Sequence, residues 1–241
     1  MDLDKSPARV REMFSQIAAR YDLLNRVLSF GIDQGWRRRT VKLVPPEGDG
    51  PILDVCTGTG DLALAYWRAS RGKRPVVGTD FCQPMLEIAR RKCCRTGAMG
   101  QVTLLEADTT QLPFADDTFQ IVGVAFGLRN LSDPDAGLRE MTRVCRPAGR
   151  VAVLEFTMPT AWPLGKLYGW YFHRLLPQIG QRLARNTRAA YNYLPESVGR
   201  FPQAGALAER MQAAGLSEVW WRPLTFGIAT LYVGRKVRGG L

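Results

Sequence analysis

The stretch PILDVCTGTGDLALA (51–65) has the pattern of a short apolar strand, a glycine-rich turn and the start of a helix. Asp54 lies at the end of the strand, and Gly58, Thr59 and Gly60 form the turn. A glycine-rich turn lets a ligand approach the backbone closely, and the amides that open the following helix then face that ligand. The stretch therefore predicts a binding site at the carboxyl end of the first strand of an α/β sheet.

The rest of the chain alternates in the same way. Further strands are predicted at 75–80, 102–107, 119–126 and 150–156, with helices at 60–70, 83–95 and 134–146 and a tight turn at 146–149. Short apolar strands separated by helices favour a parallel sheet that is covered on both faces, the doubly wound α/β fold. A helix at 203–214 and two strands joined at TFG (225–227) predict an antiparallel hairpin at one edge.

The N-terminal part is expected to be helical, with Ser6 as a cap and Pro7 at the first helical position. A turn is predicted at 28–35 and a second helix at 36–44, whose run Arg37–Arg39 is interpreted as a solvated face or, alternatively, as a contact with lipid phosphates. We expect one domain over 1–241, comprising a helical lid (1–48), a cofactor-binding core (51–156), a substrate-covering insertion (157–202) and a last helix with an edge hairpin (203–236).

Composition excludes several classes of protein. The 241 residues are 46% apolar and 23% charged, which is typical of a globular protein and not of a disordered chain or a fibre. No apolar run approaches the roughly 20 residues that a membrane helix needs, and no secretory signal opens the chain, so we expect a cytoplasmic protein. The five cysteines form no CxxC pair and there is a single histidine, so no metal site is expected. The net charge of +11 suggests an anionic partner without identifying it.

The spacing D-x-x-x-G-x-G from Asp54 to Gly60 resembles the first motif of class I methyltransferases, which bind S-adenosylmethionine. Their usual first glycine is replaced by Cys56 in this chain. Two alternatives stay open at this point. The turn could belong to an NAD-dependent Rossmann enzyme, although that fingerprint has the spacing G-x-G-x-x-G. It could also be a tight turn with no ligand.

Acidic residues at three successive strand ends favour the methyltransferase interpretation. Asp80 can accept hydrogen bonds from both ribose hydroxyls, and Phe81 can supply an apolar face to the adenine. In the methyltransferase pattern Asp108 takes the adenine amino group and Thr109 flanks the ring, although Asp108 could equally be a helix cap. Ala125, at the end of the fourth strand, completes the predicted cofactor site.

The fourth strand disfavours nucleic-acid methylation. The chain has AFGLRNLSD (125–133) where amino methyltransferases of bases have D/N-P-P-Y/F, and it lacks a nucleophilic cysteine in a Pro-Cys context. No nucleic-acid partner is therefore expected.

Several motifs resemble those of the ubiquinone/menaquinone biosynthesis C-methyltransferases, over about residues 10 to 236. They are RYDLLN (20–25), LSFGIDQGWRR (28–38), LPFADDTF (112–119), AFGLRN (125–130), RVCRPAGRVAVLEF (143–156), YLPESVGRFP (193–202) and GIATLYVGRK (227–236). The chain departs from the family at Cys56, at Cys145, at Ala148 where glycine is usual, and in its aromatic stretch at 162–172. The resemblance implies a Rossmann-like class I fold with a mostly parallel seven-stranded sheet.

The resemblance also implies methyl transfer from S-adenosylmethionine to a ring carbon of a prenylated quinol, such as demethylmenaquinol. Arg129 is assigned to stabilising the phenolate or holding a proton-accepting water, since its pKa is too high for a base. Asn130 would orient the ring oxygen, and Tyr21 in the lid could hydrogen-bond the same oxygen. Alternatively, Arg129 and Asn130 brace a loop and Tyr21 only packs. His173 is either a general base or a surface residue.

The insertion combines aromatic and basic residues, which could line a tunnel for the isoprenoid tail and rest peripherally on the anionic inner face of the membrane. An ordinary helical cover is the alternative. A homodimer is left open. Three other functions also remain: methylation of a benzoquinol in ubiquinone biosynthesis, methylation of another lipophilic phenolic acceptor, and RNA binding by a methyltransferase-like fold.

Overall fold

The computed structural model describes residues 6–29, 31–159 and 188–237, and its seven strands form one sheet in the order β3-β2-β1-β4-β5-β7-β6. The strands are β1 (Ile52–Val55), β2 (Val76–Asp80), β3 (Val102–Glu106), β4 (Phe119–Ala125), β5 (Cys145–Phe156), β6 (Leu216–Leu224) and β7 (Ala229–Lys236). Only β7 among them is antiparallel to its neighbours, β5 and β6. The predicted doubly wound, mostly parallel sheet with a C-terminal hairpin is confirmed.

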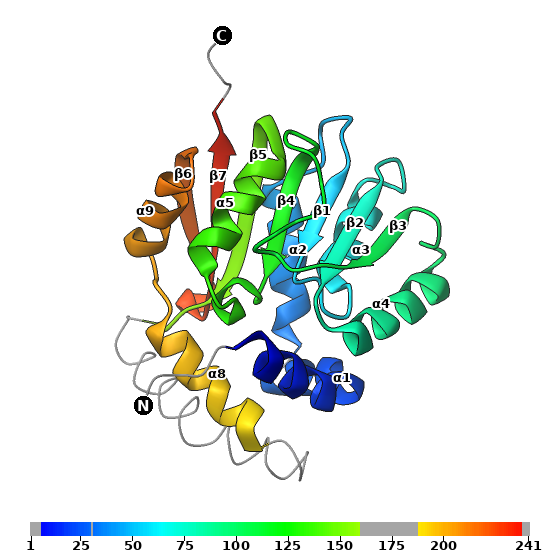
Figure 1. Cartoon of the computed structure of the whole chain (residues 1–241), viewed down its shortest axis with the longest axis vertical. Helices are drawn as coiled ribbons and strands as arrows, with labels where there is room; N and C mark the ends of the chain where they lie inside the picture. Colours follow the sequence, from blue (N-terminus) through cyan, green and yellow to red (C-terminus); the bar gives the residue numbers. More distant parts are fainter. Residues whose placement is uncertain (1–5, 30, 160–187, 238–241) are drawn as a thin grey trace.

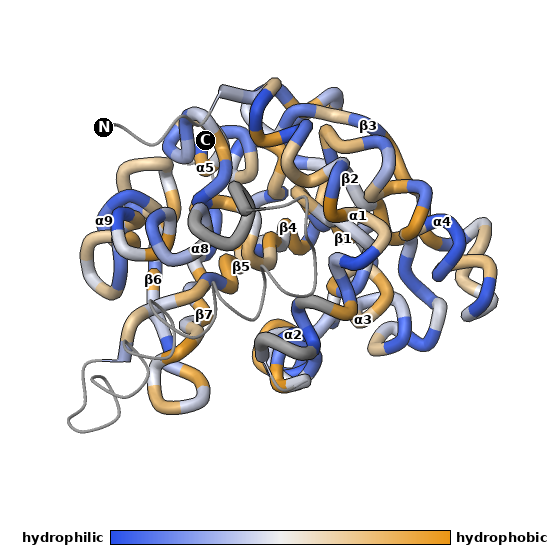
Figure 2. Tube along the Cα trace, turned by 90° about the horizontal axis from the view of Figure 1, so that it is seen from below, coloured by the Kyte–Doolittle hydropathy of each residue, from blue (hydrophilic) through white to orange (hydrophobic). Residues whose placement is uncertain are grey.

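Helices cover both faces of the sheet (Figure 1). They are α1 (Pro7–Ser29), α2 (Ile32–Leu43), α3 (Asp61–Ala69), α4 (Gln83–Thr96), α5 (Pro134–Val144), α8 (Arg188–Arg200) and α9 (Gly205–Ala213), with the short helices η1 (Leu128–Asn130) and η3 (Thr225–Gly227). Figure 2, which looks along the strands, shows α2 and α3 on one side of the sheet and α5 and α9 on the other.

Alternate residues of the central strands enter two separate apolar cores. Ile52 and Ile121 face α2 and α3, whereas Leu53 and Val122 face α5 and α9. Burial of successive residues on opposite faces is the reason that these strands are almost uninterruptedly apolar. The hydropathy colours of Figure 2 show β4 and β5 as apolar segments between the two helical layers.

Helices α1 and α8 lie across the carboxyl ends of the parallel strands (Figure 1). Strand β1 lies between β2 and β4, so the chain reverses its direction of travel through the sheet at this point. Open α/β sheets bind ligands at such a switch point, beyond the carboxyl ends of the strands. The fold thus places α1 and α8 over the edge where a ligand is expected.

Two predicted turns, and the helix end beside one of them, differ from the structure. The turn expected at 28–35 is much shorter, because α2 begins at Ile32 and the glycine preceding it adopts φ +74°. The turn expected at 146–149 is a bulge within β5: Cys145 pairs with Phe119, and regular pairing resumes at Arg150. The predicted helix over 134–146 accordingly ends at Val144.

Within the described residues, no helix has the length and apolar character required to cross a membrane. Most of the insertion expected at 157–202, including His173, lies outside the described residues.

Candidate active site

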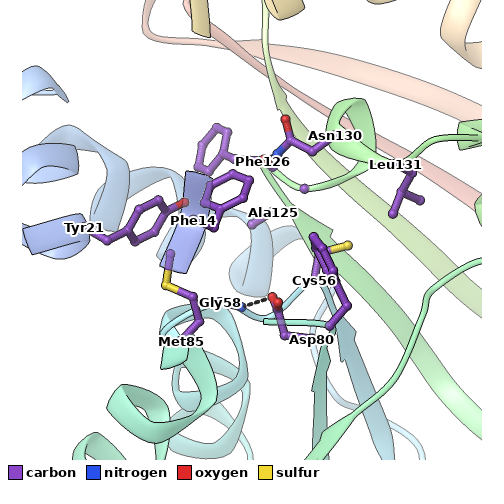
Figure 3. Close-up of a pocket in the computed structure, with 12 residues that line it drawn as sticks. Phe14, Tyr21, Cys56, Gly58, Asp80, Met85, Ala125, Phe126, Asn130 and Leu131 are labelled. Carbon is purple, nitrogen blue, oxygen red and sulfur yellow. Dashed lines mark hydrogen bonds between the residues drawn. The ribbon is translucent and has the colours of Figure 1, made fainter. Parts of the chain in front are cut away.

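A pocket opens at the carboxyl ends of β1, β2 and β4, with an empty volume of about 420 Å³ including its mouth. Its lining comes from the lid helix α1, the glycine-rich turn, the ends of β2 and β4, α4 and η1: Phe14, Tyr21, Cys56, Gly58, Asp80, Phe81, Met85, Ala125, Phe126, Gly127, Asn130 and Leu131. Figure 3 shows Phe14 and Tyr21 entering it from the lid, opposite Cys56 and Asp80. Segments far apart in the sequence therefore meet here as predicted.

The glycine-rich turn leaves open space at Gly58. Gly58 and Gly60 have φ +55° and +82°, a backbone conformation that side chains disfavour. A Cβ added at Gly58 would meet nothing within 4 Å, whereas one at Gly60 would lie 3.1 Å from the Cβ of Ala89. Gly60 thus allows α3 and α4 to pack closely, and Gly58 keeps the pocket side of the turn clear.

Asp54 holds the turn together from below. Its Oδ2 accepts hydrogen bonds from Thr57 Oγ1 at 2.5 Å and from the amide of Ala63 at 2.9 Å. Its Oδ1 is buried and has no hydrogen-bond partner among the described residues. Burial raises the pKa of Asp54 to about 7. The carboxyl group therefore retains one acceptor that no part of the described structure uses.

Asp80 ends β2 inside the pocket. Its Oδ2 accepts a hydrogen bond from the amide of Gly58 at 2.8 Å (Figure 3), and its Oδ1 accepts one from the amide of Cys82 at 2.9 Å. Burial raises the pKa of Asp80 to about 6. The carboxylate thus links the glycine-rich turn to β2 and presents its oxygens at the pocket.

The remaining predicted cofactor residues divide into two groups. Phe81 and Ala125 line the pocket. Thr109 is buried behind it, with its Oγ1 3.4 Å from Cys56 Sγ. Asp108 is exposed, and its Oδ1 accepts hydrogen bonds from the amide and the hydroxyl of Thr110, both at 2.8 Å. In the described part of the chain no helix begins directly after Asp108, so the helix-cap alternative is wrong: these contacts close a local turn. The adenine role of Asp108 stays a prediction.

Arg129 forms a buried ion pair. Its Nη1 lies 2.8 Å from Glu155 Oε2 and donates to the carbonyl of Phe126, and the guanidinium lies 5.3 Å from the ring centre of Phe156. Arg129 does not belong to the pocket lining. The sequence left two roles for Arg129: stabilising the phenolate or holding a proton-accepting water, or bracing a loop. The observed contacts are those of a residue that braces η1, and the role at the phenolate stays a prediction.

Asn130 and Tyr21 do line the pocket. Asn130 Nδ2 donates to the carbonyl of Phe126 at 3.2 Å, and its Oδ1 is buried without a partner among the described residues. Burial raises the pKa of Tyr21, so its hydroxyl is protonated at neutral pH and available as a donor. Tyr21, whose side chain also has a hydrogen bond with Asn25, and Asn130 thus line one pocket from two separate elements, α1 and η1.

Sequence reasoning missed several residues that lie at or beside the pocket. Arg37 is buried, ion-paired to Asp33 at 2.8 Å and stacked 5.1 Å from the ring centre of Phe126, so the solvated-face interpretation is wrong for this arginine. Arg38 and Arg39 are exposed. An acid four residues before Arg37 on the same helix was the available signal.

Tyr193, in α8, was noted only as part of a motif. Burial raises the pKa of its hydroxyl group, which has no hydrogen-bond partner among the described residues and lies in the electrostatic field of Arg129 and Glu155. It adds a second unused polar atom near η1. Lys92, whose contacts are given below, was also missed.

No cluster of three or more metal-ligating side chains occurs among the described residues. The pocket is therefore characterised by carboxylates, backbone amides and aromatic rings.

Comparison with protein-family models gives a match to the ubiE/COQ5 methyltransferase family over residues 2–236. The chain belongs to this family. It is accordingly an S-adenosylmethionine-dependent methyltransferase, as the glycine-rich turn and the strand-end acids predicted.

Curated relatives of this family member match it over nearly their whole length. The demethylmenaquinone methyltransferase of Thermus thermophilus is 50% identical over 224 residues, which are 93% of this chain and 100% of the relative. The ubiquinone/menaquinone biosynthesis C-methyltransferase of Geobacter sulfurreducens is 43% identical over 234 residues, which are 97% and 91% of the two chains.

Solved structures share the fold at lower identity. A SAM-dependent methyltransferase from Aquifex aeolicus has a TM-score of 0.60 at 19% identity, over 83% of this chain and 89% of its own. The cyclase SpnF has a TM-score of 0.63 at 19% identity, over 86% and 81%. Because a cyclase shares it, the fold does not determine the reaction, and the family assignment carries that information.

The pocket residues of this family member fit the methyl donor. The donor is cationic at its sulfur and amino groups, and the carboxylate of Asp80 lines the pocket. Asp54 lies buried beneath the turn, outside that lining. The open space at Gly58 lets a ligand approach the backbone. The aromatic ring of Phe81 can pack on a base.

Proposed function

We propose that this enzyme transfers a methyl group from S-adenosylmethionine to a ring carbon of a prenylated hydroquinone, converting demethylmenaquinol to menaquinol. The names of the Thermus thermophilus and Geobacter sulfurreducens relatives support a quinol acceptor. The observation that carries the proposal is that Asp80 and Asn130 line the same pocket. Asp80 supplies the carboxylate proposed to bind the cofactor, and Asn130 has an oxygen without a hydrogen-bond partner among the described residues.

The cofactor end of the proposed site comprises Asp54, Gly58, Thr59, Gly60, Asp80, Phe81, Asp108, Thr109 and Ala125. S-adenosylmethionine, when bound, supplies a methyl group on a positively charged sulfur. Asp80 accepts hydrogen bonds from the ribose hydroxyls, and Phe81 packs against the adenine. Asp54 contributes negative charge beneath the turn, which favours a cation above it.

The acceptor end of the proposed site comprises Tyr21, Arg129 and Asn130. The ring carbon becomes a better nucleophile when the neighbouring hydroxyl loses its proton, so the enzyme must stabilise a phenolate. Before ionisation, Asn130 accepts a hydrogen bond from the acceptor hydroxyl and orients the ring. A water near Arg129 takes the hydroxyl proton, and Tyr21 donates a hydrogen bond to the resulting phenolate oxygen. The ring carbon forms its bond to the methyl group as the sulfur–methyl bond breaks, and the proton on that carbon is then lost to solvent. Arg129 holds η1 in place through Glu155 and adds positive potential nearby. Holding donor and acceptor carbon together is itself a large part of the catalysis.

A benzoquinol is the second candidate acceptor, because the name of the Geobacter sulfurreducens relative includes ubiquinone as well as menaquinone. Another lipophilic phenol and an RNA are the remaining alternatives. The largely apolar lining of the pocket, which includes four aromatic rings, supports a hydrophobic ring over a polyanion.

The proposed substrate is membrane-borne, and the enzyme is proposed to act in the cytoplasm with a peripheral contact to the anionic inner face of the membrane. Exposed apolar side chains support this contact. Phe226 in η3, Leu23 in α1 and Ile32 in α2 are 74%, 57% and 39% exposed near the carboxyl edge of the sheet, and Arg38 and Arg39 are exposed close by. Apolar side chains flanked by arginines suit an anionic lipid surface.

Cosedimentation with vesicles tests this contact. Phe226→Ser should lower the fraction bound to phosphatidylglycerol vesicles, whereas Met99→Ser, at an exposed apolar residue near the opposite edge, should not. Equal binding by all three proteins would contradict the assignment of the surface. Light scattering on the same samples distinguishes a monomer from the homodimer left open by the sequence.

Methyl transfer from labelled S-adenosylmethionine tests the reaction itself. Reduced demethylmenaquinone, a demethylated benzoquinol and total RNA are offered in parallel to the wild type, to Asn130→Ala and to Arg129→Ala. We expect label on the naphthoquinol and its loss in both variants. Label on the benzoquinol alone would move the enzyme to ubiquinone biosynthesis, and label on RNA alone would overturn the proposal.

A further inference from the structure

Four side chains from the lid, the glycine-rich turn, α3 and α4 meet beside the pocket. They are Asp22 in α1, Thr59 in the turn, Asp61 at the start of α3 and Lys92 in α4, and together they are called the Lys92 cluster here. We propose that Lys92 is a positioning residue that holds the lid helix closed over the glycine-rich turn and so sets how long the cofactor stays bound.

The ammonium group of Lys92 contacts all three other members of the Lys92 cluster. Lys92 Nζ lies 2.6 Å from Asp22 Oδ2, 2.6 Å from Asp61 Oδ1 and 2.9 Å from Thr59 Oγ1. The hydroxyl of Thr59 in turn donates to Asp22 Oδ1 at 2.6 Å. An ammonium group has three protons, and each has an acceptor here. Lys92 therefore joins three separate elements through one atom.

Partial burial makes these contacts stronger than surface ion pairs. The side chains of Lys92, Asp22 and Asp61 are 17%, 23% and 23% exposed. Burial opposes ionisation of Asp61, but the charge of Lys92 and then that of Arg37 hold the pKa of Asp61 below its usual value. Charge-assisted hydrogen bonds of this kind are about twice as strong as neutral ones.

Among the described residues, the apolar contacts between the lid and α4 form one small cluster. Ala18, Phe14 and Tyr21 of α1 pack with Cys82, Met85 and Ile88 in a small cluster separate from the two cores of the sheet. Two weaker contacts join them: Ser15 Oγ lies 3.4 Å from Cys82 Sγ, and Arg11 forms an exposed ion pair with Glu106 at 3.8 Å. Loss of the Lys92 cluster should therefore loosen α1 without disturbing either core. Figure 1 shows α1 beside α4 at the edge where the pocket opens.

The position of the cluster connects lid closure to the cofactor. Thr59 follows Gly58, which lines the pocket, and Asp22 follows Tyr21, which lines it from the lid. Opening the lid for entry or release of cofactor separates Asp22 from Thr59 and Lys92. The inference rests on the proposed position of the cofactor, but it does not depend on which quinol accepts the methyl group.

Two readouts without catalysis test the role of Lys92. The first is the rate at which trypsin cleaves α1 in the full chain without cofactor, which reports lid opening alone. The second is the dissociation rate of S-adenosylhomocysteine in stopped flow. Lys92→Met keeps the length and apolar stem of the side chain. We expect both rates to rise by roughly tenfold, the factor that corresponds to one charge-assisted hydrogen bond. We expect Asp22→Asn to raise them in the same way.

Lys236→Met is the matched control, because Lys236 Nζ is 2.6 Å from Asp117 Oδ1 and its side chain is 20% exposed, outside the proposed cofactor site. It should leave both rates within about twofold of wild type. The double variant Lys92→Met/Asp22→Asn should be no faster than Lys92→Met, because both changes remove one interaction.

Three outcomes would overturn the inference. Unchanged cleavage in Lys92→Met would show that the cluster does not hold the lid, and faster cleavage with unchanged dissociation would show that the lid does not retain the cofactor. Equal rises of both rates in Lys236→Met would show that the loss of any lysine ion pair has this effect, so that it is not specific to Lys92. The variant Asp80→Asn tests the proposed cofactor position separately from the role of Lys92. Unchanged cofactor affinity in that variant would contradict the position itself.

Discussion

Arg129 and Glu155 form an ion pair whose side chains are only 6% and 1% exposed, with 2.8 Å between Nη1 and Oε2. Glu155 Oε1 also accepts a hydrogen bond from the backbone amide of Arg129 at 3.2 Å. The carboxylate at the end of β5 thus fixes both ends of the arginine, and with it the short helix η1 that carries Asn130. Arg129 therefore braces the short helix that carries Asn130, the residue proposed to bind the acceptor.

Glu155→Gln should impair both folding and catalysis, because it leaves the buried charge of Arg129 uncompensated. Removing one partner of such a pair costs about 3 to 5 kcal/mol, which corresponds to a fall in Tm of roughly 10 °C for a chain of this size. We expect a fall in kcat together with nearly unchanged affinity for S-adenosylmethionine, since Asp80 and Gly58 are untouched. Thermal melts, calorimetry and methyl transfer measure the three quantities.

Arg129→Met/Glu155→Leu provides the control for stability. Apolar replacement of both partners should recover most of the lost Tm, since well-packed apolar pairs often match buried ion pairs. Activity should stay low if the pair positions Asn130. Full activity in this double variant would contradict a role for the pair in the site.

Gly127→Ala should distort the pocket although Gly127 has an ordinary φ of −109°. An added Cβ would lie 2.4 Å from Cys56 Cβ, so the turn or η1 must shift. Overpacking of this kind costs about 1 to 3 kcal/mol. We expect a lower urea midpoint and weaker binding of S-adenosylmethionine, measured by chemical denaturation and calorimetry.

Cys56→Gly should rescue Gly127→Ala, because it removes the atom that the new Cβ would strike. Gly35→Ala is the matched control: its Cβ meets nothing within 4 Å, and it lies inside α2, so it should stabilise the protein by about 1 kcal/mol. Equal loss in Gly35→Ala, or no rescue by Cys56→Gly, would contradict the steric explanation.

Ala148→Gly should stabilise the protein slightly. Ala148 has φ +61° in the β5 bulge, and this conformation costs an L-residue about 1 to 2 kcal/mol. The greater chain entropy of glycine in the unfolded state offsets part of the gain, so we expect a net rise of roughly 0.5 kcal/mol in the free energy of unfolding. Ala206→Gly, in the exposed part of α9, should have the opposite sign. A destabilising Ala148→Gly would mean that the methyl group makes a contact worth more than the strain.

The sequence predicted the sheet well because the signal is local. Apolar runs such as ILDV in β1 and QIVGVA in β4 are buried on both faces, which leaves little ambiguity about where the strands lie. The bulge in β5 was missed because Ala148 stands where the family has glycine, and alanine gives no sign of a positive φ. Cys56 likewise has a positive φ, +49°, that its residue type does not indicate.

Candidate residues could be named from the sequence where a local pattern marks them. Asp54 and Gly58 follow from the glycine spacing of one motif, and Asp80 follows from its place at a strand end. The pairing of Arg129 with Glu155, and the joining of Asp22 to Lys92, depend on packing between segments far apart in the chain, which no local pattern encodes. Asp108 shows the opposite limit, since its carboxylate accepts hydrogen bonds from Thr110 in a local turn, where the sequence offered only an adenine contact or a helix cap.

Asp80→Asn should change how stability depends on pH. Burial raises the pKa of Asp80 in the folded protein to about 6, above the ordinary 3.8, so between about pH 4 and 6 the folded state holds a proton that the unfolded state has lost. Stability from this group is therefore present at low pH and lost as pH rises through 6. The wild type should lose up to roughly 3 kcal/mol more than Asp80→Asn between pH 4 and 7, measured by urea denaturation. Asp49→Asn, whose side chain is 93% exposed, is the control and should follow the wild type.

Affinity for S-adenosylmethionine should have the opposite pH dependence. The proposed ribose contacts need the ionised carboxylate of Asp80 as acceptor, and its pKa in the free protein is about 6. Affinity should therefore fall up to tenfold per pH unit below that value, and binding at pH 6 should release about half a proton from Asp80. Calorimetry in buffers of different ionisation enthalpy measures both effects. Asp80→Asn should bind weakly and release fewer protons at pH 6 than the wild type, because only Asp54, whose pKa is about 7, still titrates in this range. Proton uptake by the wild type, or a pH profile in Asp80→Asn identical to that of the wild type, would remove Asp80 from the ribose site.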